Sequence, residues 1–341
     1  MEGTIVITGG SGFIGTHMVD LLEMNPGLSI VNLDLNPPKK DSHRPYWMPC
    51  DVMNREELRW IFADVRPRFV AHLAGRTDMD GETIQDYCVN SAGTEHVIDA
   101  IAHAASVDRA LFVSTQFVVG PGPLPKSDLE FRPHTVYGES KMLAELAVRQ
   151  SAQECTWTIV RPTNVWGSWH PRYPHEFWKV LQRGMYVHPG SKPVMRSYGY
   201  VGNVVKQMAA ILEAPAADVH QRVLYVGDAP IVLLDWVNAF SMQLTGHRAR
   251  VIPQGALRVL ARIGDCFVAL GVRAPLYSSR LRSMTEDYPT PMEPTFALLG
   301  PPAVSLEDGV RETVAWLRAS QGEEEQKRAQ AVCRESIVGS E

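Results

Sequence analysis

Short apolar runs alternate with segments of helical spacing through the first half of the chain. Runs rich in Val, Ile and Leu predict buried strands, and apolar residues that recur every three or four positions predict helices. We expect strands at 4–8, 28–33, 69–73, 109–114 and 156–161, and helices at 14–24, 54–63, 82–104 and 137–153. Strands that alternate with helices are typical of an α/β fold with a doubly wound parallel sheet.

The pattern becomes less regular after about residue 164. Residues 166–192 are rich in aromatic residues, Pro, His and Gly, which is typical of loops that cover a ligand. A strand near 222–226 and a helix at 233–244 resume the alternation, and residues 250–318 have a mostly helical pattern.

The most apolar later stretch, 256–272, is interrupted by Arg258, Arg262 and Asp265, so it predicts an amphipathic helix. Such a helix packs on the fold or faces a lipid or a partner. Packing on the fold is the commoner arrangement.

A glycine-rich turn, Thr8-Gly9-Gly10-Ser11-Gly12-Phe13-Ile14-Gly15, follows the first strand and opens a helix. Gly9, Gly12 and Gly15 suit a tight turn, a close approach of the backbone to a pyrophosphate, and close packing of helix and strand. The next strand ends in Asp34, 19 residues beyond Gly15, where a carboxylate can bind the hydroxyls of an adenosine ribose. The chain therefore begins as a dinucleotide-binding unit.

The carboxylate of Asp34 favours NAD over NADP, because it repels a 2′-phosphate. Lys39 and Lys40 could offset that repulsion or lie in a solvated loop. Asp51 could hold the adenine amino group or cap the helix that follows it. Ala74 and Gly75 are small residues that let a nucleotide lie against a strand end.

These features predict a Rossmann-type fold with a smaller, mostly helical C-terminal lid that binds substrate. We place the parts of the chain as an NAD-binding domain at 1–164 with returning segments near 195–245, a substrate-binding lid at 165–194 and 246–318, and a polar tail at 319–341. The tail is charged and poor in large apolar residues, so we expect a frayed helix or disorder there.

Composition narrows the class of protein. The chain has 341 residues and a net charge of −5, so we expect neither nucleic acid nor an anionic membrane as a partner. Five scattered cysteines without a CxxC pair indicate reduced thiols. His170 and His175 lack partners at ligand spacing, so no metal site is expected. The first strand follows the start directly, which favours a cytoplasmic protein.

Tyr137 and Lys141 lie four residues apart on a predicted helix and therefore on one face. A free phenol, with a pKa of about 10, is a poor base at neutral pH. An ammonium one turn away and a positively charged nicotinamide ring both favour phenolate, so Tyr137 can exchange a proton with an alcohol. Ser114 and Thr115 end the strand expected beside the nicotinamide, and a hydroxyl there can bond the same substrate oxygen.

In this order the motifs resemble the extended short-chain dehydrogenase/reductases, and within them the NAD-dependent epimerase/dehydratase family typified by UDP-galactose 4-epimerase. The resemblance covers roughly residues 4 to 318. Its motifs are Thr8 to Gly15, Asp34, Asp51-Val52, His72-Leu73-Ala74-Gly75, Asn90 to Thr94, Ser114-Thr115 with Gly120, Tyr137 to Lys141, Arg161 to Gly167 and Arg196 to Asn203.

The resemblance implies a role for each matching position. Thr115 corresponds to the residue that holds the reacting hydroxyl, Tyr137 to the general acid/base, and Lys141 to the residue that lowers its pKa and binds the nicotinamide ribose. The implied cofactor-binding residues are Gly9, Gly12, Phe13, Ile14, Asp34, Asp51, Val52, Leu73, Ala74, Gly75, Asn90, Tyr137, Lys141 and Pro162. The implied substrate-binding residues are Thr115, Asn164, Arg196 and Arg282, with Arg280 as another candidate for the second arginine.

One departure bears on the reaction. Dehydratases of the family usually carry an Asp-Glu pair directly after the catalytic threonine, whereas this chain has Gln116-Phe117, so elimination is disfavoured. We therefore expect an NAD-dependent nucleotide-diphosphate-sugar 4-epimerase. The alternatives are a dehydrogenase or keto-reductase that acts once on a nucleotide sugar or a sterol-like alcohol, and a non-catalytic cofactor sensor. The resemblance also implies a homodimer formed by helices 82–104 and 137–153.

Overall fold

The computed structural model describes residues 1–190, 192–271 and 276–338. Its contacts divide the chain into two compact units. The first unit contains Met1–Val165, Met195–Ile231 and Glu286–Ala303, and the second contains Trp166–Val194, Val232–Thr285 and Val304–Glu341.

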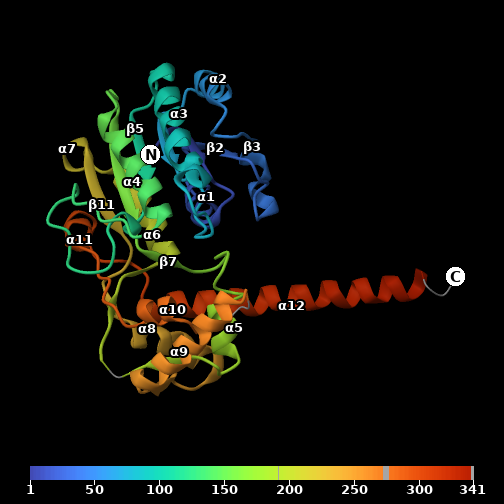
Figure 1. The fold of residues 1–341 in the computed structure, drawn as a ribbon. Coiled ribbons are helices and arrows are strands. Elements are labelled where there is room, and N and C mark those ends of the chain that lie inside the picture. The colour runs from blue at the N-terminus through green and yellow to red at the C-terminus, as the bar shows by residue number, and fades with distance from the viewer. Residues whose placement is uncertain (191, 272–275, 339–341) are drawn as a thin grey trace. The chain divides into compact units, whose positions relative to one another are not determined.

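The first unit is built on a seven-stranded sheet with the order β11-β6-β5-β4-β1-β2-β3, in which every neighbouring pair is parallel (Figure 1). Its strands are β1 (Gly3–Thr8), β2 (Leu28–Asp34), β3 (Trp47–Pro49), β4 (Phe69–His72), β5 (Arg109–Val113), β6 (Thr156–Pro162) and β11 (Arg222–Val226). The strand order reverses between β1 and β4. In such sheets ligands bind beyond the carboxyl ends of the strands at this point.

Helices pack on the sheet. Those of the first unit are α1 (Phe13–Leu22), α2 (Arg55–Val65), α3 (Cys88–Ala104), α4 (Val136–Gln150), α6 (Val201–Glu213), α7 (Ala216–Val219) and α11 (Glu293–Leu299). α1 lies beside α6, whereas α2, α3 and α4 pack in sequence on one another.

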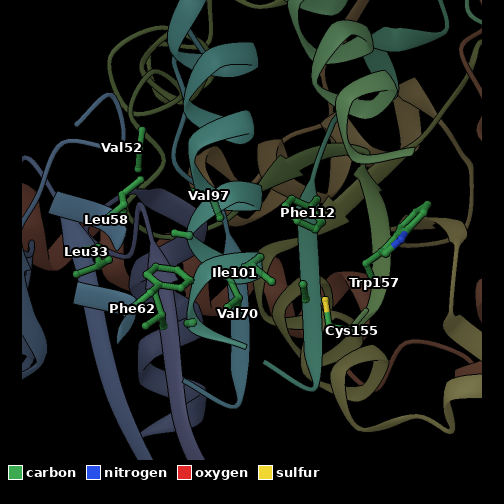
Figure 2. Packing of buried hydrophobic residues seen from close by; sticks show 14 of the residues in the cluster. Leu33, Val52, Leu58, Phe62, Val70, Val97, Ile101, Phe112, Cys155 and Trp157 are labelled. Atoms are coloured by element: carbon green, nitrogen blue, oxygen red, sulfur yellow. The ribbon is translucent and has the colours of Figure 1, made fainter. Parts of the chain in front are cut away.

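One hydrophobic core joins α2, α3 and α4 to the sheet (Figure 2). Leu58 and Phe62 of α2, Val97 and Ile101 of α3 and Val70 of β4 belong to this core, and all five side chains are buried. The buried positions of each helix recur every three or four residues, whereas β4 is buried on both faces, as expected for an interior parallel strand. The doubly wound parallel fold predicted from the sequence is confirmed.

The second unit is mostly helical. Its elements are α5 (Phe177–Gln182), α8 (Leu233–Thr245), α9 (Gln254–Ala269), α10 (Ser278–Ser283), α12 (Leu306–Val338) and the paired strands β8 (Val187–Pro189) and β13 (Arg250–Ile252). α8 packs on α5 and α12, so it belongs to this unit although we grouped it with the nucleotide-binding part. Three short strands, β7 (Asn164–Trp166), β9 (Met195–Arg196) and β10 (Tyr198–Tyr200), lie where the chain passes between the units, and β12 (Ile231–Val232) pairs with β9.

The C-terminal segment takes one of the two expected forms. α12 continues as a single helix to Val338, through the tail where we expected a frayed helix or disorder. This tail is rich in Glu, Gln, Lys, Arg and Ala, which have high helix propensity. Residues 339–341 of the predicted tail lie outside the described residues. Among the described residues, no helix is long and apolar enough to cross a membrane.

Candidate active site

The glycine-rich turn brings the ends of β1 and β4 into contact without side chains between them. Gly9 has a φ of +75°, and a Cβ at this position would lie 2.6 Å from the backbone nitrogen of Ala74. Gly12 precedes α1, and no side chain caps that helix. The first turn of α1 contains no acidic residue, so the positive end of the helix dipole can face an anionic group. This geometry fits the pyrophosphate of a dinucleotide.

Asp34 ends β2, and both of its carboxylate oxygens accept hydrogen bonds from the backbone. The N–H of Ser11 donates to Oδ2 at 3.1 Å, and the N–H of Asn36 donates to Oδ1 at 2.9 Å. Lys40 does not remain a free cation, because its ammonium pairs with Asp20 at 2.6 Å. Lys39 is exposed, as expected for a solvated loop.

Two predicted cofactor residues between β3 and α2 have clear structural roles. The Oδ1 atom of Asp51 accepts the N–H of Met53 at 2.9 Å, and the residue that caps α2 is Asn54, whose side chain accepts the N–H of Glu57. The alternative that Asp51 caps this helix is therefore wrong. The side chain of Val52 is buried in the hydrophobic core of the first unit.

A chain of hydrogen bonds connects β1, β4 and α3 below the glycine turn. Thr8 Oγ1 lies 2.7 Å from His72 Nδ1, and His72 Nε2 lies 2.9 Å from Thr94 Oγ1. Thr94 donates its only hydroxyl proton to the carbonyl of Asn90, so we infer from the network that His72 Nε2 carries the proton and Nδ1 accepts from Thr8. Burial lowers the pKa of His72 to about 3, which keeps the ring neutral.

The loop after β4 is held by the amide of Asn90, which is completely buried. Its Oδ1 atom accepts the N–H of Arg76 at 2.8 Å, while Nδ2 donates to the carbonyl of Arg76 and to Ser140 Oγ. A Cβ on Gly75 would lie 2.6 Å from Asn90 Oδ1 and 3.3 Å from Lys141 Nζ. Asn90 thus positions this loop against α4, and only a residue without a side chain fits at 75.

The helix α4 carries the predicted proton-transfer residues. Thr135 caps it by accepting the N–H of Gly138 at 3.0 Å, and this fixes the turn that contains Tyr137. The Tyr137 ring is buried, with its centroid 6.1 Å from that of Phe117. One turn further, Lys141 Nζ donates to the carbonyl of Val113 at 3.0 Å. Burial lowers the pKa of Lys141 to about 8, although nearby Glu145 acts in the opposite direction.

The two hydroxyl residues after β5 are used differently. Ser114 donates to the buried carboxylate of Glu145. Thr115 instead accepts the N–H of Phe117 at 3.3 Å, which leaves its own proton available to a substrate oxygen. This difference agrees with Thr115, rather than Ser114, as the residue that holds the reacting hydroxyl.

The predicted substrate-binding residues are distributed over the two units, and each has its own local partners. Asn164 Nδ2 donates to the carbonyl of Ser197 at 3.3 Å. The guanidinium of Arg196 lies 5.4 Å from the centroid of the Tyr288 ring and donates to the carbonyl of Glu286. Arg282 lies on α10 in the second unit. Pro162 is the last residue of β6, opposite Val226 of β11.

Sequence reasoning missed His134 and Tyr288 near Thr115 and Tyr137, and it noted Gln116 only as the replacement of an acid. Gln116 is fully buried, and neither of its amide atoms has a hydrogen-bond partner among the described residues. Its backbone carbonyl accepts a hydrogen bond from the hydroxyl of Tyr288 at 2.9 Å. The ring of His134 stacks on Phe117 at 5.6 Å between centroids. His134 could have been found from its place three residues before Tyr137, whereas Tyr288 lies 172 residues beyond Gln116 and no sequence spacing predicts their contact.

Comparison with known proteins shows the family of the chain. A sequence model of the NAD-dependent epimerase/dehydratase family matches residues 5–227. The human dTDP-D-glucose 4,6-dehydratase is 30% identical over 233 residues, and the match covers 61% of this chain and 65% of that protein. The N-acetyl-alpha-D-glucosaminyl-diphospho-ditrans,octacis-undecaprenol 4-epimerase of Escherichia coli O157:H7 is 27% identical, with 64% of this chain and 65% of that protein covered. The chain thus spans just under two thirds of the length of these relatives.

The fold has close counterparts among solved structures. The complex of Thermus thermophilus UDP-glucose 4-epimerase with NAD superposes with a TM-score of 0.69 at 22% identity, and 92% of this chain and 99% of that chain are covered. At this identity the likeness is one of fold.

Proposed function

The chain belongs to the NAD-dependent epimerase/dehydratase family, and we propose that within it the protein is a nucleotide-diphosphate-sugar 4-epimerase. The observation that carries this proposal is the proton-transfer set Thr115, Tyr137 and Lys141. In this set, Thr115 is followed by Gln116 and Phe117 and not by two acidic residues. The cofactor is NAD, and the glycine turn and Asp34 fit it.

In the proposed reaction, Tyr137 accepts the proton of the sugar hydroxyl and later returns it. The ammonium of Lys141 donates to the carbonyl of Val113 and is held one turn away from Tyr137. Its positive charge favours the phenolate form of Tyr137, which accepts the proton. Thr115 donates a hydrogen bond to the same sugar oxygen and orients it. Bound NAD would supply the hydride acceptor, and afterwards the hydride donor, for the sugar carbon. The keto-sugar turns over between the two transfers, so the configuration is inverted and NAD is regenerated.

The human relative is a dehydratase, but the residues after Thr115 argue against elimination. Loss of water requires a group that protonates the leaving hydroxyl. Neither the amide of Gln116 nor the ring of Phe117 can donate a proton in this way. Gln116 is also fully buried, and its backbone carbonyl accepts a hydrogen bond from Tyr288.

Epimerisation is tested by incubating the NAD-supplemented enzyme with UDP-, dTDP-, GDP- and CDP-sugars. Product configuration is followed by NMR and NADH by absorbance at 340 nm. A new epimer without net NADH supports the proposal. NADH in proportion to consumed substrate identifies a dehydrogenase instead, and a 4-keto-6-deoxy product identifies a dehydratase. If no nucleotide sugar reacts, the epimerase proposal fails and sterol-like alcohols become the substrates to test.

The role of Tyr137 is tested with Tyr137→Phe, which removes only the hydroxyl. Turnover should fall at least about 100-fold, since general acid–base catalysis typically contributes that much, while NAD binding is retained. Tyr46→Phe is a matched control, because Tyr46 lies in the segment between β2 and β3. Equal loss of turnover in both variants would contradict the assignment.

We also propose a homodimer that pairs through α3 and α4. Light scattering on the purified protein distinguishes a dimer of about twice 37.9 kDa from a monomer. A monomer under catalytic conditions would overturn this part of the proposal.

A further inference from the structure

Helix α9 has an apolar face that packs within the second unit. Leu257 and Ala261 are buried there together with Leu281 of α10. Gly264 continues this face, and a Cβ at 264 would overlap the carbonyl of Leu276. These positions are four and three residues apart, so they form one side of the helix.

A second apolar side of the same helix is exposed. Val259, Leu260, Ile263 and Phe267 are 50–60% exposed, and Leu270 just beyond the helix is 77% exposed. With 3.6 residues per turn, these five positions fall within an arc of roughly 100°. Six of the 16 exposed large hydrophobic side chains of the described residues lie in 251–270, whereas the others are scattered along the chain. A clustered patch of this kind marks an interaction surface.

The segment around this stripe is strongly basic. Residues 246–285 contain seven arginines and one aspartate, a net charge of +6, in a chain whose total is −5. The rest of the chain therefore carries −11. Arg258 and Arg262 are exposed one turn apart on the side of α9 next to the apolar stripe. We expected no anionic membrane as a partner because the net charge of the whole chain is negative. That total does not reveal the local excess of positive charge in residues 246–285.

We propose that α9 binds to an anionic phospholipid surface, with its apolar stripe in the headgroup boundary and its arginines on the lipid phosphates. Helices that lie in the plane of a membrane combine an apolar face of this width with flanking Arg or Lys. Guanidinium groups bind phosphate with two hydrogen bonds, and the segment uses arginine without a single lysine. Self-association through this face would bring two segments of +6 together, so charge complementarity favours lipid over a second copy.

The proposal is tested by flotation of the full chain with vesicles. Vesicles of phosphatidylcholine with about one third phosphatidylglycerol should carry the protein at least tenfold better than pure phosphatidylcholine, and 0.5 M NaCl should reverse most of this gain. Equal flotation with both compositions, or none with either, would overturn the proposal.

Two paired variants separate the contributions of the stripe and the arginines. Ile263→Asp with Phe267→Asp, and Arg258→Glu with Arg262→Glu, should each lower flotation at least tenfold while the circular dichroism spectrum is unchanged. Met24→Asp with Leu35→Asp is the matched control, because these side chains are 80% and 64% exposed on the first unit. If the control pair loses as much binding, or if the α9 variants change the oligomeric state and not flotation, the surface is not a lipid-binding one. Epimerase activity is assayed separately without vesicles. A failure of the epimerase proposal can therefore be distinguished from a failure of the lipid-binding proposal.

Discussion

Arg161 and Glu145 form a two-point ion pair in the interior of the first unit. Arg161 Nε donates to Glu145 Oε1, and Arg161 Nη2 donates to Oε2, each at 2.8 Å. Both side chains are almost completely buried. Glu145 lies one turn beyond Lys141 on α4, and Arg161 lies near the end of β6. The pair therefore fixes the helix that carries the proton-transfer residues to the edge of the sheet where the cofactor is expected.

Arg161→Met should destabilise the protein by about 3–5 kcal/mol, because it leaves the Glu145 carboxylate buried without its partner. Adding Glu145→Met should recover part of this loss, since two apolar side chains then replace two charges. Urea unfolding of the single and double variants measures both values. A double variant no more stable than Arg161→Met would show that the loss does not come from the uncompensated charge.

Lys141 should make the free energy of unfolding increase with pH in the alkaline range. Its pKa of about 8 in the folded chain lies below its usual value of 10.5. Burial of the charged ammonium therefore lowers the free energy of unfolding most below pH 8, and this destabilisation disappears as the pH rises to 10.5. Relative to Lys141→Met, the wild type should therefore gain about 3 kcal/mol of unfolding free energy from pH 7 to 10.5. The exposed Lys206 provides the control, and Lys206→Met should show no such trend.

His72 should contribute to acid sensitivity. Its folded pKa of about 3 lies below the usual 6.5, so the unfolded chain takes up a proton first and stability is lost as pH falls from 6.5 toward 3. At pH 5 this costs about 2 kcal/mol relative to pH 8. His72→Gln keeps a donor and an acceptor but does not titrate, so its unfolding free energy should fall less between pH 8 and 5. His103→Gln, on the exposed side of α3, should follow the wild type.

Asp34→Ser should weaken the binding of NAD and strengthen the binding of NADP. The ratio of the two dissociation constants should change by at least tenfold, or about 1.4 kcal/mol. The physical reason is that the carboxylate repels a 2′-phosphate. Fluorescence titration with both nucleotides measures the ratio. Asp64→Asn removes an equal charge at an exposed position of α2, and an unchanged ratio in Asp34→Ser would contradict the assignment.

Local patterns predicted the part of the fold that short-range chemistry determines. β1, the glycine turn, α1 and β2 follow one another in the chain, and the spacing of their residues is the motif itself. β3 was missed because it has only three residues, and its strand character comes from pairing with β2. α6 was missed although its buried residues have helical spacing, since Val201 to Asn203 were interpreted only as a family motif.

The contacts that support the site could not be predicted from the sequence, because they form between residues that are brought together only in the folded chain. Position 52 was assigned to the cofactor from a motif, but its valine side chain packs in the core. The side-chain partner of Glu145 lies 16 residues away on another element, and the hydroxyl that donates to the backbone carbonyl of Gln116 lies 172 residues away. A sequence shows which side chains can form such pairs, and only the packing of helices on the sheet selects among them.

The two backbone hydrogen bonds of Asp34 restrict how cofactor choice can evolve. The same carboxylate that selects the ribose also ties Ser11 of the glycine turn to Asn36 beyond β2. A mutation that admits NADP by removing the charge also releases both segments. A lineage that changes nucleotide at this position must therefore acquire a new acceptor for these N–H groups, or it changes cofactor and keeps a looser turn.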